Sequence, residues 1–283
     1  QIAAEGDSLG GYLDAFTEAG ENSRRRLTMF HNYSAVADVV VFDQRGFSRR
    51  GTMLEAPSSP PSPLDRPSSV QAATEAWSAY ARAAAAANPT QDLSGYTITQ
   101  CAADVNDLRK ALSYPKVSLL GTSFGSQWSF AIMRLYPDIV VRAVLSGVEP
   151  LDANFDMPSH VFAAIQRLAF DADRAPGLQP YLPAGGLMTA VSELRDRLAR
   201  GPVTAQVTDP KTGKTEAVAL GLEDLQAALI PEDAEAWPAF ILALYHGHYE
   251  GWARAEIAAR RGPLFSTPIS PLIDSGLGVS AAR

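Results

Sequence analysis

Residues 117–125 read Val-Ser-Leu-Leu-Gly-Thr-Ser-Phe-Gly, and this stretch decides the predicted fold. It opens with an apolar run typical of a buried strand, closes in a G-x-S-x-G pattern, and leads into a helical pattern that continues to Tyr136. A strand that turns sharply into a helix around a serine is the arrangement of a nucleophile elbow. Gly121 and Gly125 would let strand and helix approach closely, and Ser123 would stand at the helix N-terminus as a candidate catalytic nucleophile. A chance match in a tight turn is the alternative.

The segments on either side of this stretch extend the same pattern. Apolar runs at residues 37–43 and 140–147 predict two more strands, and Thr97 is the predicted cap of a helix that continues to about Leu112. Strand, helix, strand, helix, strand is the order typical of a parallel sheet. The sequence therefore predicts an α/β fold with a parallel sheet.

The character of the chain changes after Pro150, where no further strong strand–helix–strand unit follows. Earlier in the chain, a Pro/Ser-rich stretch predicts a loop and an alanine-rich stretch predicts a helix (residues 55–69 and 70–87). Beyond Pro150 the patterns predict two helical segments with a β-hairpin between them (residues 159–200, 222–260 and 202–220). We therefore expect a core over residues 1–150, an inserted, mostly helical cap over residues 151–265, and a return segment over residues 266–283.

Composition excludes several classes of protein. The chain has 283 residues, a formal net charge of −7 and one cysteine. One cysteine rules out a disulfide scaffold within the chain and a four-cysteine zinc site. The acidic balance argues against nucleic acid as a partner, and no apolar run reaches the roughly 18 residues of a membrane span. We expect no metal and no cofactor. The single Cys101 is expected to be a small buried residue and not a nucleophile.

Three further segments carry a resemblance to a known family. Residues 41–48 (Val-Phe-Asp-Gln-Arg-Gly-Phe-Ser), 103–112 and 134–140 match motifs that flank the elbow, although Phe47-Ser48 lacks a second glycine. On these segments the chain resembles the α/β-hydrolase superfamily and, within it, the proline iminopeptidase and tripeptidyl-aminopeptidase-like group. The resemblance covers about residues 36–150. It implies a serine hydrolase that removes residues from a peptide N-terminus, and a carboxylesterase of the same fold is the alternative.

The resemblance also implies an oxyanion hole. The Phe124 N–H, at the start of the helix, would point toward the developing oxyanion. The second donor would come from a glycine-rich loop after an early strand, which here corresponds to residues 5–11, with Gly6 and Asp7 as the candidate donors. This loop lacks the histidine and proline of the family. An ordinary surface loop is the alternative. In the same resemblance Asp43 and Arg45 are organising residues, and a structural ion pair is the favoured interpretation.

A serine nucleophile needs a base and an acid, and in this fold the chain order is Ser, acid, His. Glu149 and Asp152, just past the strand at 140–147, are the possible acids. His246 and His248 satisfy the order as possible bases but lie in a helical cap pattern. We favour a chain that is incomplete at both ends, with the catalytic His and Asp beyond Arg283.

Two consequences follow for partners and location. A second chain could carry the C-terminal part of the core, and the substrate would be a small peptide or ester. A non-catalytic binding protein that keeps the fold without a base is the alternative from another class. The chain opens at Gln1 without an initiator Met, and together with the family's frequent export this favours a secreted or periplasmic protein over a cytoplasmic one.

Overall fold

The computed structural model describes residues 2–5, 16, 19–47, 51–152, 157–208, 213–230, 233–262, 264, 267–278 and 280–281. The chain forms two compact units. The first comprises Gln1–Pro57, Ala84–Phe155 and Phe265–Arg283, and the second comprises Ser58–Ala83 and Asp156–Leu264.

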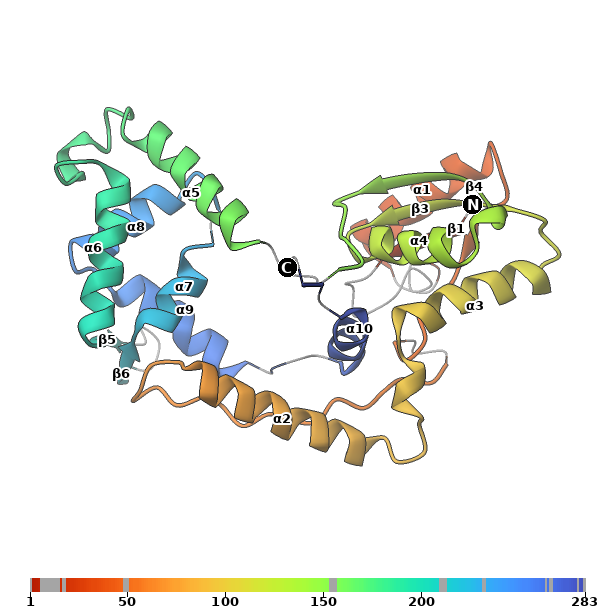
Figure 1. Ribbon diagram of the computed structural model, residues 1–283, viewed down its shortest axis with the longest axis horizontal. Helices are drawn as coiled ribbons and strands as arrows, with labels where there is room; N and C mark the ends of the chain where they lie inside the picture. Colours follow the sequence, from red (N-terminus) through yellow and green to blue (C-terminus); the bar gives the residue numbers. More distant parts are fainter. Residues whose placement is uncertain are drawn as a thin grey trace. The chain divides into compact units, whose positions relative to one another are not determined.

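A parallel sheet forms the centre of the first unit (Figure 1). Its strands lie in the order β2-β1-β3-β4, and every neighbouring pair is parallel. Their bounds are β1 (Ile2–Glu5), β2 (Val40–Val41), β3 (Val117–Thr122) and β4 (Val140–Ser146). The predicted parallel sheet and the strands at residues 117–121 and 140–147 are therefore confirmed.

The first unit also contains the helices α1 (Glu21–Ser34), α3 (Ile98–Ala111), α4 (Phe124–Leu135) and α10 (Ile269–Leu277), with 3₁₀ turns at Leu93–Gly95 (η2) and Pro137–Ile139 (η3). Helix α4 packs on this sheet, α3 packs on α4, and α10 packs on α3, and together they enclose a small core. Thr97 caps α3 as predicted, since its Oγ accepts a bond from the Gln100 N–H at 3.4 Å. Cys101 lies fully buried in the core, and burial raises the pKa of its thiol to about 12.

The strand predicted over residues 37–43 is much shorter in the structure. Only Val40 and Val41 are strand residues, and they pair with Ile2 and Ala3 of β1. The prediction rested on a continuous apolar run, whereas the pairing with β1 is limited to these two residues. The Asp38 side chain instead accepts a hydrogen bond from the Tyr114 hydroxyl at 2.8 Å, which raises the pKa of that tyrosine.

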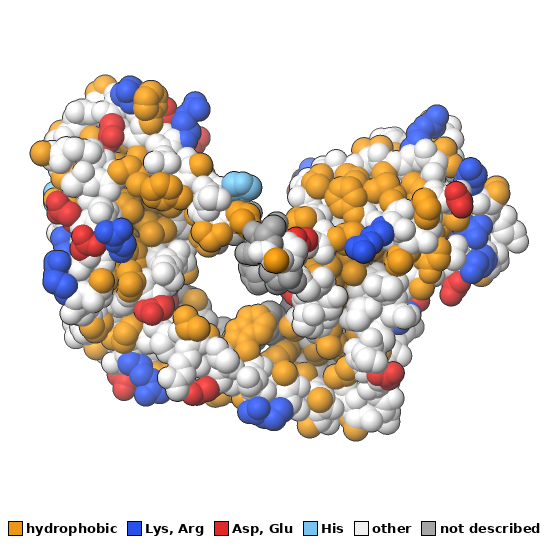
Figure 2. Space-filling view, viewed as in Figure 1, with side chains coloured by type: hydrophobic (Ala, Val, Ile, Leu, Met, Phe, Trp, Pro, Cys, Tyr) orange, Lys and Arg blue, Asp and Glu red, His pale blue; other side chains and the backbone are white. Residues whose placement is uncertain are grey.

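The strand β4 lies at one end of the described sheet and is largely exposed. Val144 is 61% exposed, and Ala143, which lies on the opposite face of the strand in regular register with β3, is exposed as well. Hydrophobic side chains are gathered on the surface of this unit (Figure 2). The described residues therefore leave both faces of β4 uncovered, although its β-branched sequence is typical of a buried parallel strand.

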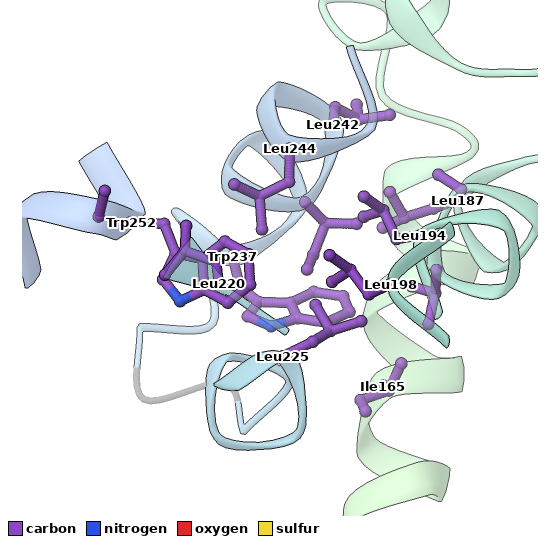
Figure 3. Close-up of a cluster of buried hydrophobic side chains, with 14 of the residues drawn as sticks. Ile165, Leu187, Leu194, Leu198, Leu220, Leu225, Trp237, Leu242, Leu244 and Trp252 are labelled. Atoms are coloured by element: carbon purple, nitrogen blue, oxygen red, sulfur yellow. The ribbon is translucent and has the colours of Figure 1, made fainter. Parts of the chain in front are cut away.

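The second unit is mostly helical. Its helices are α2 (Val70–Ala87, which continues into the first unit), α5 (Pro158–Ala172), α6 (Leu187–Arg200), α7 (Leu222–Ala228), α8 (Trp237–Tyr245) and α9 (Glu250–Arg261), with a 3₁₀ turn at Gln179–Tyr181 (η4). The strands β5 (Val203–Thr208) and β6 (Thr215–Leu220) pair as an antiparallel hairpin, as predicted. Side chains from α5 to α9 and from β6 meet in one buried cluster around Leu194, Leu225 and Trp237 (Figure 3).

The prediction assigns residues 1–150 to the core, whereas in the structure Ser58–Ala83 belongs to the second unit and packs with later residues. Backbone bonds join the two segments, from Ser62 N–H to Arg260 O and from Ala219 N–H to Leu64 O, both 2.8 Å. Such pairing between segments far apart in the chain leaves no signal in the local sequence.

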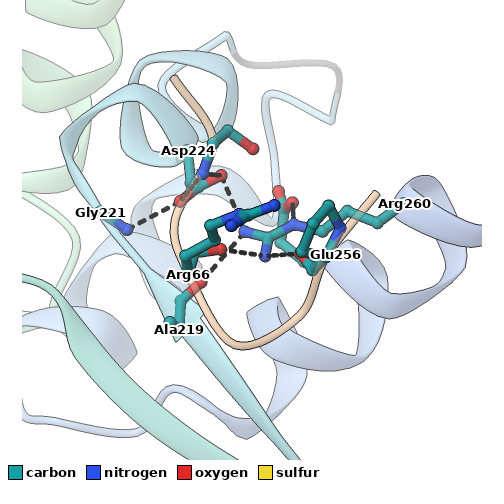
Figure 4. A network of polar contacts seen from close by, with 8 residues as sticks. Arg66, Ala219, Gly221, Asp224, Glu256 and Arg260 are labelled. Carbon is teal, nitrogen blue, oxygen red and sulfur yellow. Dashed lines mark hydrogen bonds and ion pairs between the residues drawn. The ribbon is translucent and has the colours of Figure 1, made fainter. Parts of the chain in front are cut away.

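A buried arginine fastens this segment (Figure 4). The Arg260 guanidinium, whose side chain is 4% exposed, donates to Pro63 O and Arg66 O and to the Asp224 carboxylate at 2.9 Å. Asp224 in turn accepts the Gly221 N–H at 2.7 Å. Because both charges are nearly inaccessible to water, each depends on the other for stabilisation.

Replacing Arg260 by methionine should therefore destabilise the second unit strongly. Removal of one partner of a buried pair costs about 3–5 kcal/mol, since it leaves an uncompensated buried charge. The matched control is Arg261→Met, because Arg261 pairs with Glu216 at the surface with 49% of its side chain exposed. The control should lower the free energy of unfolding by less than about 1 kcal/mol. Urea denaturation measures both variants, and equal losses would contradict the assignment.

Candidate active site

The turn from β3 into α4 places Ser123 in a strained backbone conformation. Its φ is 54° and its ψ is −126°, and a positive φ is unfavourable for any side chain with a Cβ. The Ser123 N–H donates to Ser146 O of β4 at 3.0 Å, and Ser123 O accepts the Ser126 N–H at 2.8 Å. These bonds hold the strained residue between the strand ends and the first turn of α4.

The two glycines of the motif lie in contact across this turn. A Cβ built on Gly121 would lie 2.3 Å from the Gly125 carbonyl oxygen and 2.8 Å from Ser129 Oγ. No side chain fits at that distance, so only glycine allows β3 and α4 to come this close. As the first residue of α4, Phe124 has an N–H with no acceptor inside the helix, at the positive end of the helix dipole.

Two buried polar side chains at the start of α4 bind the loop that follows β4. Ser126 and Gln127, both fully buried, belong to the first turn of α4. Ser126 Oγ donates to Ser123 O at 2.7 Å and accepts the Glu149 N–H at 2.9 Å. Gln127 Nε2 donates to Pro150 O at 2.7 Å. Sequence analysis did not single out these two residues. The signal was a group of polar side chains (Ser126, Gln127 and Ser129) in an otherwise apolar helix.

Because Ser126 and Gln127 hold this loop, Glu149 contacts the elbow serine directly. Ser123 Oγ donates a hydrogen bond to Glu149 Oε1 at 2.7 Å. The prediction gave Glu149 as a possible acid, which would bond the base, whereas here it bonds the serine itself. Asp152, the other predicted acid, accepts bonds from the Ser280 N–H at 2.7 Å and from the Ser280 hydroxyl. Gly6 and Asp7, the predicted oxyanion donors, lie outside the described residues.

The two candidate bases lie in the second unit, so their use stays a prediction. His246 and His248 follow the end of α8 at Tyr245, and the interpretation that they belong to a helix is wrong. Gly247 between them has a φ of +87°, a conformation that few residues other than glycine adopt in a chain leaving a helix. His246 Nε2 bonds the Tyr181 carbonyl at 2.8 Å, which fixes the proton on that nitrogen.

Residues that the sequence analysis singled out line two of the cavities, one in each unit. In the second unit an apolar pocket of about 590 Å³ is lined by Leu178, Tyr181, Ala239, Leu242, Ala243, His246 and His248. In the first unit an open cleft of about 670 Å³ lies beside Asp43, Arg45 and Asp104. Neither cavity alone identifies a ligand.

The Arg45 side chain on the rim of the cleft has a structural role. Its Nε donates to Asp104 Oδ2 and its Nη1 donates to Gly95 O, both at 2.6 Å. The hydrogen bond to Asp104 raises the pKa of Arg45. The sequence predicts a structural ion pair of Asp43 and Arg45, and the structure shows Arg45 paired with Asp104 of α3.

The comparison with protein families supplies an identification. The family described as the alpha/beta hydrolase fold matches residues 9–179, which is more than half of the chain. The chain belongs to the α/β-hydrolase fold family. A comparison with curated proteins finds no match. Membership of the α/β-hydrolase family indicates a hydrolase, and it agrees with the parallel sheet and the strand–turn–helix at Ser123.

Two further properties concern metal binding and membrane spans. Among the residues that the structure describes, no three metal-binding side chains come together. Within the same residues, no helix has the length and apolar character needed to cross a membrane.

Replacing Gly121 by alanine should disrupt the elbow. The added methyl group would overlap the Gly125 carbonyl, so β3 and α4 must move apart at a cost on the order of 1–3 kcal/mol or more. The control is Gly251→Ala in α9, where a Cβ meets no atom within 4 Å. The control should be neutral or stabilising by up to about 1 kcal/mol. Thermal unfolding measures both, and an unchanged midpoint for the Gly121 variant would contradict the close approach.

Proposed function

We propose that the protein is a serine hydrolase in which Ser123 is the nucleophile, and that it acts as an aminopeptidase of the proline iminopeptidase-like type. The observation that carries the proposal is the strained Ser123, held at φ 54° between a parallel strand and the N-terminus of α4. Strain of this kind persists only where surrounding structure supports it, and it is common at catalytic nucleophiles.

The reaction would be acyl transfer to water. Ser123 Oγ attacks the scissile carbonyl, a base accepts the serine proton, and the proton then passes to the departing amine. The Phe124 N–H supports the oxyanion, and Gly6 and Asp7 are the proposed second donors. Water then attacks the acyl-enzyme and releases the N-terminal residue as the free acid.

The base and acid would come from a segment that covers β4, and we propose a strand–helix unit of the same or a second chain. The exposed Ala143 and Val144, on opposite faces of β4, support this, because a parallel strand with apolar residues on both faces is stable when both faces are covered. In this fold the acid and the histidine follow the nucleophile in the chain order.

One alternative differs from the proposal in its substrate, and the other in whether Ser123 is catalytic. A carboxylesterase would use the same nucleophile on an ester, and the fold does not separate the two substrates. A non-catalytic binding protein would keep the elbow without a base. The bond from Ser123 to Glu149 favours this second candidate, because the described structure gives the serine a carboxylate partner in place of an imidazole.

Replacing Ser123 by alanine in the whole protein should remove hydrolysis of aminoacyl p-nitroanilides and of p-nitrophenyl esters. Loss of a nucleophile lowers kcat by about 10³-fold or more. The control is Ser275→Ala, because Ser275 is an exposed residue of α10 whose hydroxyl, among the described residues, donates to its own helix at Leu272 O. Hydrolysis that survives in the Ser123 variant would exclude the proposed nucleophile.

Replacing Val144 by aspartate should lower the stability of the whole protein and, with it, hydrolysis. A charge placed in a covered apolar contact costs on the order of 3 kcal/mol. The control is Val70→Asp, because Val70 is 73% exposed at the start of α2. Thermal unfolding and steady-state kinetics measure both variants. If the two variants behave alike, β4 has no covering segment and the proposed source of the base is wrong.

A further inference from the structure

The contact between Glu149 and Ser123 has a built support and is not an accident of a surface loop. The buried Ser126 hydroxyl accepts the Glu149 N–H, and the buried Gln127 amide holds the next carbonyl, that of Pro150. Gly147 turns the chain with a φ of +55°, and its Cβ would lie 3.5 Å from Ser123 N. These contacts direct the carboxylate toward Ser123 Oγ.

The charge of this carboxylate has no cation to balance it in the described structure. Glu149 is half-buried, and among the residues that the structure describes no Lys, Arg or His forms an ion pair with it. Glu149 takes the place beside the Ser123 hydroxyl that a base of the triad would occupy. Its negative charge also opposes the oxyanion that forms beside the serine, unless a cation arrives with the substrate.

A substrate with a free N-terminus brings that cation to the right place. The α-nitrogen is separated from the scissile carbonyl carbon by the α-carbon alone, so it lies beside any group that contacts the attacking oxygen. Since Glu149 Oε1 is 2.7 Å from Ser123 Oγ, the carboxylate is within hydrogen-bonding reach of an α-ammonium group on the bound acyl unit. An ion pair with the substrate would replace the bond to the serine and free Oγ for its base.

We propose that Glu149 is a specificity-determining residue that selects substrates with a free α-ammonium group next to the scissile carbonyl. This inference rests on the proposed function of Ser123 as the nucleophile. It assigns the recognition of the N-terminus to a residue of the nucleophile unit, whereas an acid of the triad would act on all substrates alike.

The test compares a panel of aminoacyl p-nitroanilides with their N-acetyl derivatives, in which the α-amine is an uncharged amide. The whole protein should hydrolyse the free-amine form with the higher kcat/KM. In Glu149→Gln, which keeps the shape and a hydrogen-bond acceptor, the ratio of free-amine to N-acetyl kcat/KM should fall about 10- to 100-fold, the size of one charged hydrogen bond. The control is Asp138→Asn, an exposed carboxylate of η3, which should leave the ratio unchanged.

Two outcomes would overturn the inference. One is an unchanged ratio of free-amine to N-acetyl kcat/KM in Glu149→Gln. If kcat/KM falls equally for both substrate forms, the ratio is also unchanged, and Glu149 then acts on the reaction of every substrate. The other is an unaltered protein that does not prefer the free amine, and this result stands even if the variant does not fold. Titration of the unaltered protein with a fluorophosphonate separates the two proposals. If the reagent labels the protein but the ratio of free-amine to N-acetyl kcat/KM differs from the expected one, only the proposed role of Glu149 is refuted. If the reagent does not label the protein, the proposed nucleophile is refuted as well.

Discussion

The close backbone approach at Gly121 and Gly125 is the constraint on which the rest of the site depends. Because the Gly125 carbonyl occupies the space of a side chain at Gly121, β3 must turn into α4 within a single residue, and Ser123 takes up the strain. The cost of that strain is offset by backbone bonds to Ser146 and Ser126. The same turn brings the start of α4 under the loop after β4, and this is why Glu149 reaches the serine.

Local signals in the sequence predicted the elements around the elbow. The apolar run before Gly121, the G-x-S-x-G spacing and the Thr97 cap each act within a few residues, so their consequences can be derived without tertiary structure. The hairpin of residues 203–220 was predictable for the same reason, since alternation on both sides of a polar turn specifies it. Family membership supports the fold, and the role of Ser123 is the proposal built on it.

Contacts between distant residues were not predictable from the sequence. The segment around Ser62 and Leu64 joins the second unit through partners about 150 to 200 positions later, and Arg260 resembles an ordinary cation at a helix C-terminus until its burial is known. The shortness of β2 is a property of its pairing with β1, which the apolar run of residues 37–43 does not show. Glu149 was predicted as a possible acid of the triad, but its contact with Ser123 depends on the register of β3 against β4 and on the hydrogen bonds from Ser126 and Gln127.

The most direct measurement of the central claim is peptide mapping of the whole protein after reaction with a fluorophosphonate. A strained serine that is presented to substrate and activated by a base reacts with such a reagent far faster than any other hydroxyl. The account predicts one phosphonylated residue, Ser123, in the peptide that spans β3 and the start of α4. An unmodified Ser123 in folded protein, or modification at a different serine, would contradict it.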